Sequence, residues 1–193
     1  MTQVLHHWID GEATEGSPER HDPLHDPSVG AQTGRLPIAS VADVDAAVGS
    51  AKAAFPGWRD TSLSQRNRIL FRFRDLVDRH TDELAALITG QHGKVLSDAK
   101  GEVTRGLDVI EFACGLPHLV KGEHAEDVSR GIDAFSVRQP LGVVAGITPF
   151  NFPAMVPLWM FPIAIACGNT FVLKPSEKDP AANVRLAELF TEA

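Results

Sequence analysis

Between Arg138 and Lys174 the chain carries no Asp, Glu, Lys, Arg or His. A run of this length is long enough to cross a bilayer as a helix, which needs about 20 apolar residues. Prolines interrupt the run at positions 149, 153, 157 and 162. Because each proline inside a helix removes a hydrogen bond and costs roughly 3 kcal/mol or more, we expect part of a globular core here and no membrane span.

Cut at its prolines and glycines, the run predicts a strand, a helix and a second strand. Leu141–Ile147 is a continuous apolar stretch, which is typical of a parallel strand covered on both faces. Residues 154–168 predict a crossover helix with proline in its early turns and Gly168 at its end. Asn169–Lys174 is the second strand, and another helix follows Pro180. This alternation predicts an α/β fold with a partial doubly wound parallel sheet.

The first 40 residues alternate short apolar pieces with clusters of Pro, Gly, Asp and Ser. These clusters predict turns between short strands. Asp10-Gly11 would supply the positive φ angles that a tight hairpin turn requires. Further along, Val120–Pro140 is strand-like but polar on one face, which predicts a protruding hairpin or a pair of edge strands.

Apolar residues recur at helical spacing between Ser40 and Leu116, and this pattern predicts four helices. We expect the first to be capped by Ser40 and to have its apolar face at Val44, Ala47, Val48, Ala51, Ala54 and Phe55. The second runs from about Ser64 to His80. Thr81 caps the third and Ser97 opens the fourth, whose apolar stripe is Ala99, Val103, Ile110 and Ala113.

Composition narrows the possible partners. The net charge of -7 argues against a nucleic-acid partner, because phosphate binding needs clustered positive charge. The two cysteines, Cys114 and Cys167, form neither a disulfide framework nor a metal-ligand spacing, so no metal site is expected. The amino terminus lacks the apolar segment of a secretory signal. We therefore expect a reducing, cytoplasmic setting.

Polar residues follow both predicted strands of the charge-free run. Thr148–Asn151 comes after the first strand and Lys174–Lys178 after the second. Ligands of doubly wound sheets bind outside the carboxyl ends of the strands, so the two clusters predict one ligand site. The phosphate-binding pattern GxGxxG is absent, and an ordinary dinucleotide site does not follow from pattern alone.

The segments "GVVAGITPFNFP" and "ACGNTFVLKPSE" together resemble the aldehyde dehydrogenase superfamily. The chain is most similar to its methylmalonate-semialdehyde dehydrogenase branch, which acylates coenzyme A. This closer likeness depends on Phe150, where most of the superfamily has Trp, on "PAMVPLWMFPIAIACGNTF" and on "GEVTRGLDVIEFACGLPHLVKGE". The resemblance covers essentially the whole chain but only the amino-terminal part of the family.

The resemblance implies oxidation of an aldehyde through a cysteine thioester, with NAD as cofactor. In this branch coenzyme A releases the thioester and carbon dioxide is lost, so methylmalonate semialdehyde gives propionyl-CoA and malonate semialdehyde gives acetyl-CoA. It also implies a homotetramer. The organisation would be amino-terminal strands and helices over 1–119, an oligomerisation hairpin over 120–140, and the first part of the NAD-binding domain over 141–193.

Residue by residue, Asn151 matches the family's asparagine that donates its side-chain amide to the oxyanion. Thr148 and Phe150 match positions that flank the cofactor. An amide fixed at a strand end can stabilise developing negative charge. From the sequence alone, Asn151 could equally cap the turn before the crossover helix.

Lys174 and Glu177 match the pair that holds the adenosine ribose hydroxyls, with Lys178 beside them. A carboxylate at this position favours NAD over its 2′-phosphorylated form. The plainer alternative is a surface ion pair, worth about 0–1 kcal/mol.

Arg105 matches the arginine with which this branch grips the substrate carboxylate. Guanidinium suits that task because it donates two parallel hydrogen bonds. The alternative from the sequence is an ion pair with Glu102 or Asp108, one turn away on the same helix.

The family's nucleophilic cysteine has no counterpart within these 193 residues. Cys167 lies in an apolar setting, where a thiolate is disfavoured, and Cys114 lies in the predicted fourth helix. We expect the isolated chain to be inactive and poorly stable, as an amino-terminal fragment would be. Two alternatives stay open: a superfamily member that hydrolyses its thioester with water, and a non-catalytic module that associates with full-length subunits.

Overall fold

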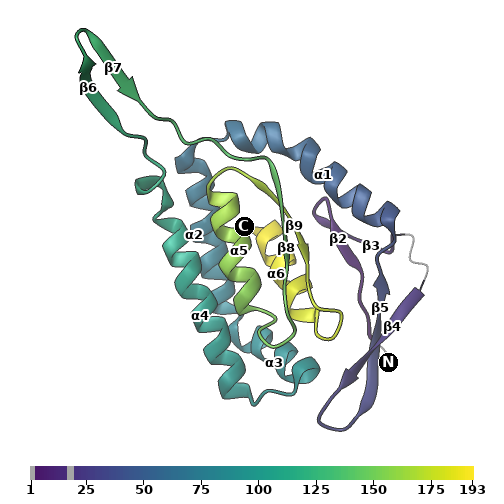
Figure 1. Ribbon diagram of the computed structural model, residues 1–193. Helices are drawn as coiled ribbons and strands as arrows, with labels where there is room; N and C mark the ends of the chain where they lie inside the picture. The colour runs from purple at the N-terminus through teal and green to yellow at the C-terminus, as the bar shows by residue number, and fades with distance from the viewer. Residues whose placement is uncertain (1–2, 17–19) are drawn as a thin grey trace.

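The computed structural model describes residues 3–16 and 20–193. In Figure 1, helices pack around a short parallel sheet, an arm of strands lies along one side, and a hairpin projects from the body. The strands of the arm are β1 (Gln3–Val4), β2 (His7–Ile9), β3 (Glu12–Thr14), β4 (Arg20–Asp26) and β5 (Ala31–Ile38). β5 lies between β1, which is parallel to it, and β4, which is antiparallel.

The predicted tight turn joins β2 to β3. These strands pair antiparallel, and both residues between them have positive φ, 58° at Asp10 and 78° at Gly11. Two consecutive positive φ angles are the mark of a hairpin turn that matches the twist of its strands. The sequence prediction for this turn is therefore confirmed.

Four helices follow: α1 (Val41–Asp60), α2 (Leu63–Arg79), α3 (Thr81–His92) and α4 (Leu96–Cys114). Ser40 caps α1 in a capping box with Asp43, as its position predicts. Val44 and Val48 are 49% and 40% exposed, whereas Ala47, Ala51 and Phe55 are half-buried, so the predicted apolar face of α1 is only partly covered. α2, α3 and α4 pack on each other, whereas α1 contacts mainly β9 and β8 of the parallel sheet.

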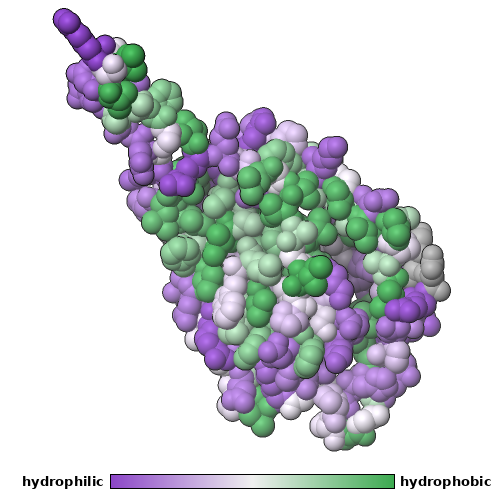
Figure 2. Space-filling view, viewed as in Figure 1, coloured by the Kyte–Doolittle hydropathy of each residue, from purple (hydrophilic) through white to green (hydrophobic). Residues whose placement is uncertain are grey.

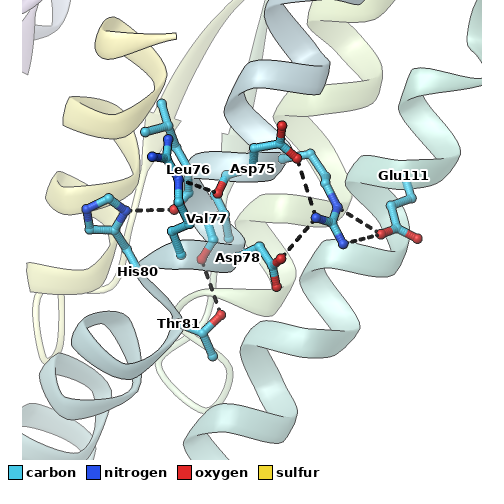
Figure 3. Close-up of polar contacts among 9 residues, drawn as sticks. Asp75, Leu76, Val77, Asp78, His80, Thr81 and Glu111 are labelled. Atoms are coloured by element: carbon cyan, nitrogen blue, oxygen red, sulfur yellow. Dashed lines mark hydrogen bonds and ion pairs between the residues drawn. The ribbon is translucent and has the colours of Figure 1, made fainter.

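The predicted cap of α3 and the predicted first residue of α4 are also wrong. The residue before α3 is His80, and the Thr81 hydroxyl donates backwards to the Val77 carbonyl oxygen at 3.2 Å instead of capping the new helix (Figure 3). α4 begins at Leu96, one residue before Ser97, and has no side-chain cap. Near the junction of α2 and α3, the Arg74 guanidinium of α2 forms ion pairs with Glu111 of α4 at 2.9 Å and with Asp78 at 3.0 Å (Figure 3).

The remaining elements form the predicted strand–helix–strand–helix unit: β8 (Val143–Ile147), α5 (Met155–Ala166), β9 (Thr170–Lys174) and α6 (Ala181–Glu192). β8 and β9 are parallel, with Ile147 opposite Lys174. Coverage of β8 on both faces is not observed, since Ile147 is 79% exposed. An apolar run predicts a strand, but it does not say how many faces the rest of the chain covers.

One apolar cluster joins α2, α3 and α4 to α5 and α6, and its large members include Phe73, Leu84, Ile110, Leu158 and Leu186. The apolar stripe predicted for α4 is fully buried, with Ala99, Val103 and Ile110 in this cluster and Ala113 in a second one. Gly106 lets α4 approach α5 closely, because a Cβ at that position would overlap the Leu158 side chain. At the other end of α5, the buried Arg66 guanidinium donates to the Ala166 carbonyl oxygen at 2.9 Å.

The projecting hairpin consists of β6 (His124–Ser129) and β7 (Ile132–Phe135), whose residues are all exposed. Apart from the hairpin, an exposed apolar region covers the centre of the face in Figure 2, over β8 and α5. Leu141 is 90% exposed and Trp159 is 45% exposed. Among the described residues, no helix combines the length and apolar character that a membrane crossing requires.

Candidate active site

The two predicted polar clusters meet at the carboxyl ends of β8 and β9. The Thr148 amide donates to the Lys174 carbonyl oxygen at 3.1 Å. The Lys178 ammonium lies 4.3 Å from the centre of the Phe150 ring, a cation–π contact. Parallel pairing thus brings residues from two strand ends to one edge of the sheet, where such folds bind ligands.

Thr148 and Phe150 lie differently within this edge. Thr148 is 4% exposed, and its hydroxyl has no hydrogen-bond partner in the part of the chain that the structure describes. Phe150 is 47% exposed and lies between the Lys178 ammonium and the His92 ring, whose centre is 6.3 Å away. Phe150 therefore provides an exposed aromatic surface at this edge of the sheet.

Lys174 and Glu177 form an exposed ion pair, with 2.9 Å between Nζ and Oε2. A hydrogen bond from the Glu177 backbone and the neighbouring Lys174 ammonium lower the pKa of the Glu177 carboxyl. The carboxylate is therefore charged at neutral pH and able to accept hydrogen bonds from hydroxyl groups. The pair fits both readings of the sequence, a ribose-binding pair and a surface ion pair.

Asn151 does not cap α5. Its side-chain amide is exposed and forms no hydrogen bond with any described residue. The first amides of α5 use a different acceptor: the Ala154 and Met155 amides donate to Oε1 of Glu102 on α4, at 2.8 and 3.1 Å. The capping alternative for Asn151 is therefore wrong, and its amide is free for another partner.

Arg105 is exposed on α4 and forms no ion pair with Glu102 or Asp108 among the described residues. Its guanidinium carbon lies 5.6 Å from the centre of the Phe152 ring. The ion-pair alternative for Arg105 is thus wrong. Phe152 is the next residue after Asn151, so the guanidinium contacts the aromatic residue that adjoins the one with the free amide.

Sequence reasoning missed two residues of this site, Lys94 and Glu102. The Lys94 ammonium pairs with Oε2 of Glu102, donates to the Asn151 carbonyl oxygen at 2.7 Å, and lies 4.1 Å from the Phe152 ring centre. Glu102 has no exposed surface. The sequence does contain a signal for Glu102, because this residue lies beside Val103 on the apolar stripe of α4, and a buried charged residue needs a partner.

Asp179, which follows Lys178 in the loop before α6, was also missed. It is 2% exposed. Burial raises the pKa of Asp179 to about 7; the nearby Ser176 hydroxyl opposes this rise, and the negative charge of Glu102 adds to it. This carboxyl therefore titrates near neutral pH.

Neither cysteine is placed as a nucleophile. Cys114 is the last residue of α4 and Cys167 follows α5, and both thiols are free. Burial raises the pKa of each thiol, so the reactive thiolate is disfavoured in both. Within the described residues, no group of three or more His, Cys, Asp or Glu could hold a metal ion.

The profile of the aldehyde dehydrogenase family matches residues 14–193. The malonate-semialdehyde dehydrogenase of Pseudomonas aeruginosa is 49% identical over 190 residues, 98% of this chain and 38% of that protein. The mitochondrial, acylating methylmalonate-semialdehyde dehydrogenase of Arabidopsis thaliana is 48% identical over 185 residues, 96% of this chain and 30% of that protein.

Among solved structures, a Sinorhizobium meliloti protein described as a methylmalonate-semialdehyde dehydrogenase, in complex with NAD, superposes with a TM-score of 0.97. It is 49% identical, and the match covers 100% of this chain and 39% of that one. The chain thus spans well under half the length of these relatives. Since the family profile covers nearly all of it, the chain belongs to the aldehyde dehydrogenase family.

Proposed function

We propose that this protein serves in the NAD-dependent, coenzyme A-acylating oxidation of malonate semialdehyde and methylmalonate semialdehyde, giving acetyl-CoA and propionyl-CoA. One observation carries the proposal. The Asn151 amide and the Arg105 guanidinium are both without polar partners among the described residues, and the guanidinium lies 5.6 Å from the ring centre of Phe152, the residue after Asn151. A substrate with an aldehyde at one end and a carboxylate at the other would use both groups.

Each group suits one end of such a substrate. The Asn151 amide would donate to the aldehyde oxygen as it gains negative charge, and a donor fixed in advance stabilises that charge more than the ground state. The Arg105 guanidinium would bind the carboxylate through two parallel hydrogen bonds. The thiolate that attacks the aldehyde would come from the part of the relatives' length that this chain does not span, because Cys114 and Cys167 are unsuited to the role.

The edge of the sheet fits NAD. Glu177 would accept hydrogen bonds from the ribose hydroxyls, and Lys174 would donate to them, since the two groups already lie together and exposed. The buried Thr148 hydroxyl, which has no hydrogen-bond partner among the described residues, lies at the end of β8 and could bond the cofactor. Phe150 and Lys178 would form one side of the cofactor site. When bound, NAD would accept the hydride released from the substrate.

A hybrid enzyme tests the proposal. In it, residues 1–193 replace the segment that they match in the Pseudomonas aeruginosa relative. With malonate semialdehyde we expect NADH formation that depends on coenzyme A, with acetyl-CoA identified by mass spectrometry. Acetate without any need for coenzyme A would support the hydrolytic alternative. An inactive hybrid that is folded and binds NAD, beside an active parent, would overturn the proposal.

The separate 193-residue chain provides the matched control. We expect it to reduce no NAD with malonate semialdehyde, because neither of its cysteines is a suitable nucleophile. Measurable NADH formation by the purified chain would contradict that assignment.

We also propose that the β6–β7 hairpin contacts a second subunit in a homotetramer. Its apolar side chains are open to contact: Val128 and Ile132 are each 56% exposed and Phe135 is 76% exposed. Phe135→Asp in the hybrid enzyme should shift the oligomer to smaller species in sedimentation velocity, whereas Val29→Asp, an exposed substitution in the arm of strands, should not. Capture of the parent enzyme by the 193-residue chain would favour the non-catalytic module.

A further inference from the structure

The segment Asn151–Met155 comprises the second half of the connection between β8 and α5 together with the first residue of α5, and it includes the proposed oxyanion donor. Helices begin with amides that lack partners within the helix, and Ser, Thr, Asp or Asn ordinarily supplies the missing acceptor. The residue before α5 is Ala154, which provides none. The segment therefore needs its polar partners from elsewhere in the fold.

Glu102 supplies the missing acceptor from α4. One carboxylate oxygen accepts the Ala154 and Met155 amides at 2.8 and 3.1 Å, and the other accepts the Lys94 ammonium. A negative charge at a helix amino terminus is stabilised by the exposed amides there. With no exposed surface, this carboxylate depends on all three bonds.

Lys94 holds the other end of the same segment. It follows Gly93, whose left-handed conformation (φ 86°) ends α3 and turns the chain toward α4. From there its ammonium donates to the Asn151 carbonyl oxygen at 2.7 Å and lies over the Phe152 ring. Its remaining hydrogen bond goes to Glu102, so one ion pair fixes the backbone at residue 151 and at residues 154 and 155.

We propose that Lys94 and Glu102 are positioning residues for the reaction: their ion pair holds the backbone of residues 151–155 so that the Asn151 amide is free and fixed. The inference rests on the proposed function of Asn151. It differs from a merely structural role, in which the pair would anchor α3 and α4 to α5 without any effect specific to Asn151.

A double-mutant cycle in the hybrid enzyme separates these roles. Lys94→Met removes the ammonium but keeps the length and apolar character of the side chain. We expect kcat with malonate semialdehyde to fall about 10- to 100-fold, because a small misplacement of a catalytic group costs about that much, while the KM for NAD stays unchanged. In the Asn151→Ala background, Lys94→Met should lower kcat no further.

Lys100→Met is the matched control. Lys100 lies on α4 and pairs with a carboxylate of α3, Asp82, at 2.7 Å, and none of the hydrogen bonds or ion pairs of the described residues joins it to residues 151–155. We expect this variant to keep the parent kcat. If Lys94→Met does not fold, Lys94→Gln retains a donor for the Asn151 carbonyl oxygen and replaces it in the cycle, with a smaller expected loss.

The outcomes distinguish the positioning role of Lys94 from the proposed catalytic role of Asn151. An additive loss from Lys94→Met in the Asn151→Ala background, or a kcat equal to the parent, would overturn the positioning role while leaving the proposed function in place. A parent-like kcat for Asn151→Ala alone would overturn the proposed role of Asn151 itself. A loss from Lys94→Met that disappears in the Asn151→Ala background supports the inference.

Discussion

The buried carboxyl of Asp179 makes the stability of the folded chain depend on pH. Its pKa of about 7 in the folded chain lies above the value of about 3.9 expected for the unfolded chain. The folded state therefore keeps a proton that the unfolded state releases. The resulting loss of stability is absent below about pH 4, grows as the pH rises to about 7, and is complete above that.

Asp179→Asn should remove this pH-dependent loss, since an amide does not ionise. We expect the variant to gain stability over the wild-type chain as the pH is raised from about 5 to about 8, by up to about 3 kcal/mol. Urea unfolding of the 193-residue chain at the two pH values measures it. Asp108→Asn, on the exposed side of α4, is the control and should show no such change. An equal effect of Asp179→Asn at both pH values would contradict the assignment.

At the scale of elements, the contact between α4 and α5 positions both halves of the candidate site. α4 carries Glu102 and Arg105, and α5 begins just after Asn151. Gly106 lies against Leu158 of α5, which is fully buried. A side chain at residue 106 would have to displace Leu158 or push the two helices apart.

Gly106→Ala should therefore destabilise the chain by about 1–3 kcal/mol, as overpacking of a core does. Gly101→Ala on the same helix meets nothing within 4 Å, and it should leave the chain as stable or raise its stability by about 0.5–1 kcal/mol. Chemical unfolding of the two variants gives the comparison. Equal stability changes would show that α4 and α5 do not pack as closely as described.

The elements themselves were largely predictable from the sequence, but their ends and exposures were not. The apolar spacing of α4 placed its buried stripe correctly, because that stripe faces other helices of the same chain. Thr81 was wrongly chosen as a cap and Ser97 as the residue that opens its helix, because each has a residue type that favours a cap but lies just inside its helix. Burial of Val44 or of Ile147 depends on what packs against α1 and β8, which periodicity does not reveal.

For the molecule as a whole, the sequence predicted where the candidate site lies but not what holds it together. The predicted parallel pairing of the two strands already places Thr148 beside Lys174, since Thr148 follows β8 and Lys174 ends β9. The pair formed by Lys94 and Glu102 depends on how the α3–α4 turn packs against residues 151–155, and no local pattern shows that. Most of the side chains predicted from resemblance are exposed, whereas the pair of Lys94 and Glu102 is nearly buried.

The most direct test of the account is the substrate dependence of Arg105→Ala in the hybrid enzyme. Losing a charge-assisted pair with the substrate carboxylate should cost roughly 1.5–3 kcal/mol, so kcat/KM for malonate semialdehyde should fall about 10- to 150-fold. With propanal, which lacks the carboxylate, kcat/KM should change little. Equal losses with the two aldehydes would contradict the assignment of Arg105 and, with it, the proposed preference for carboxylated semialdehydes.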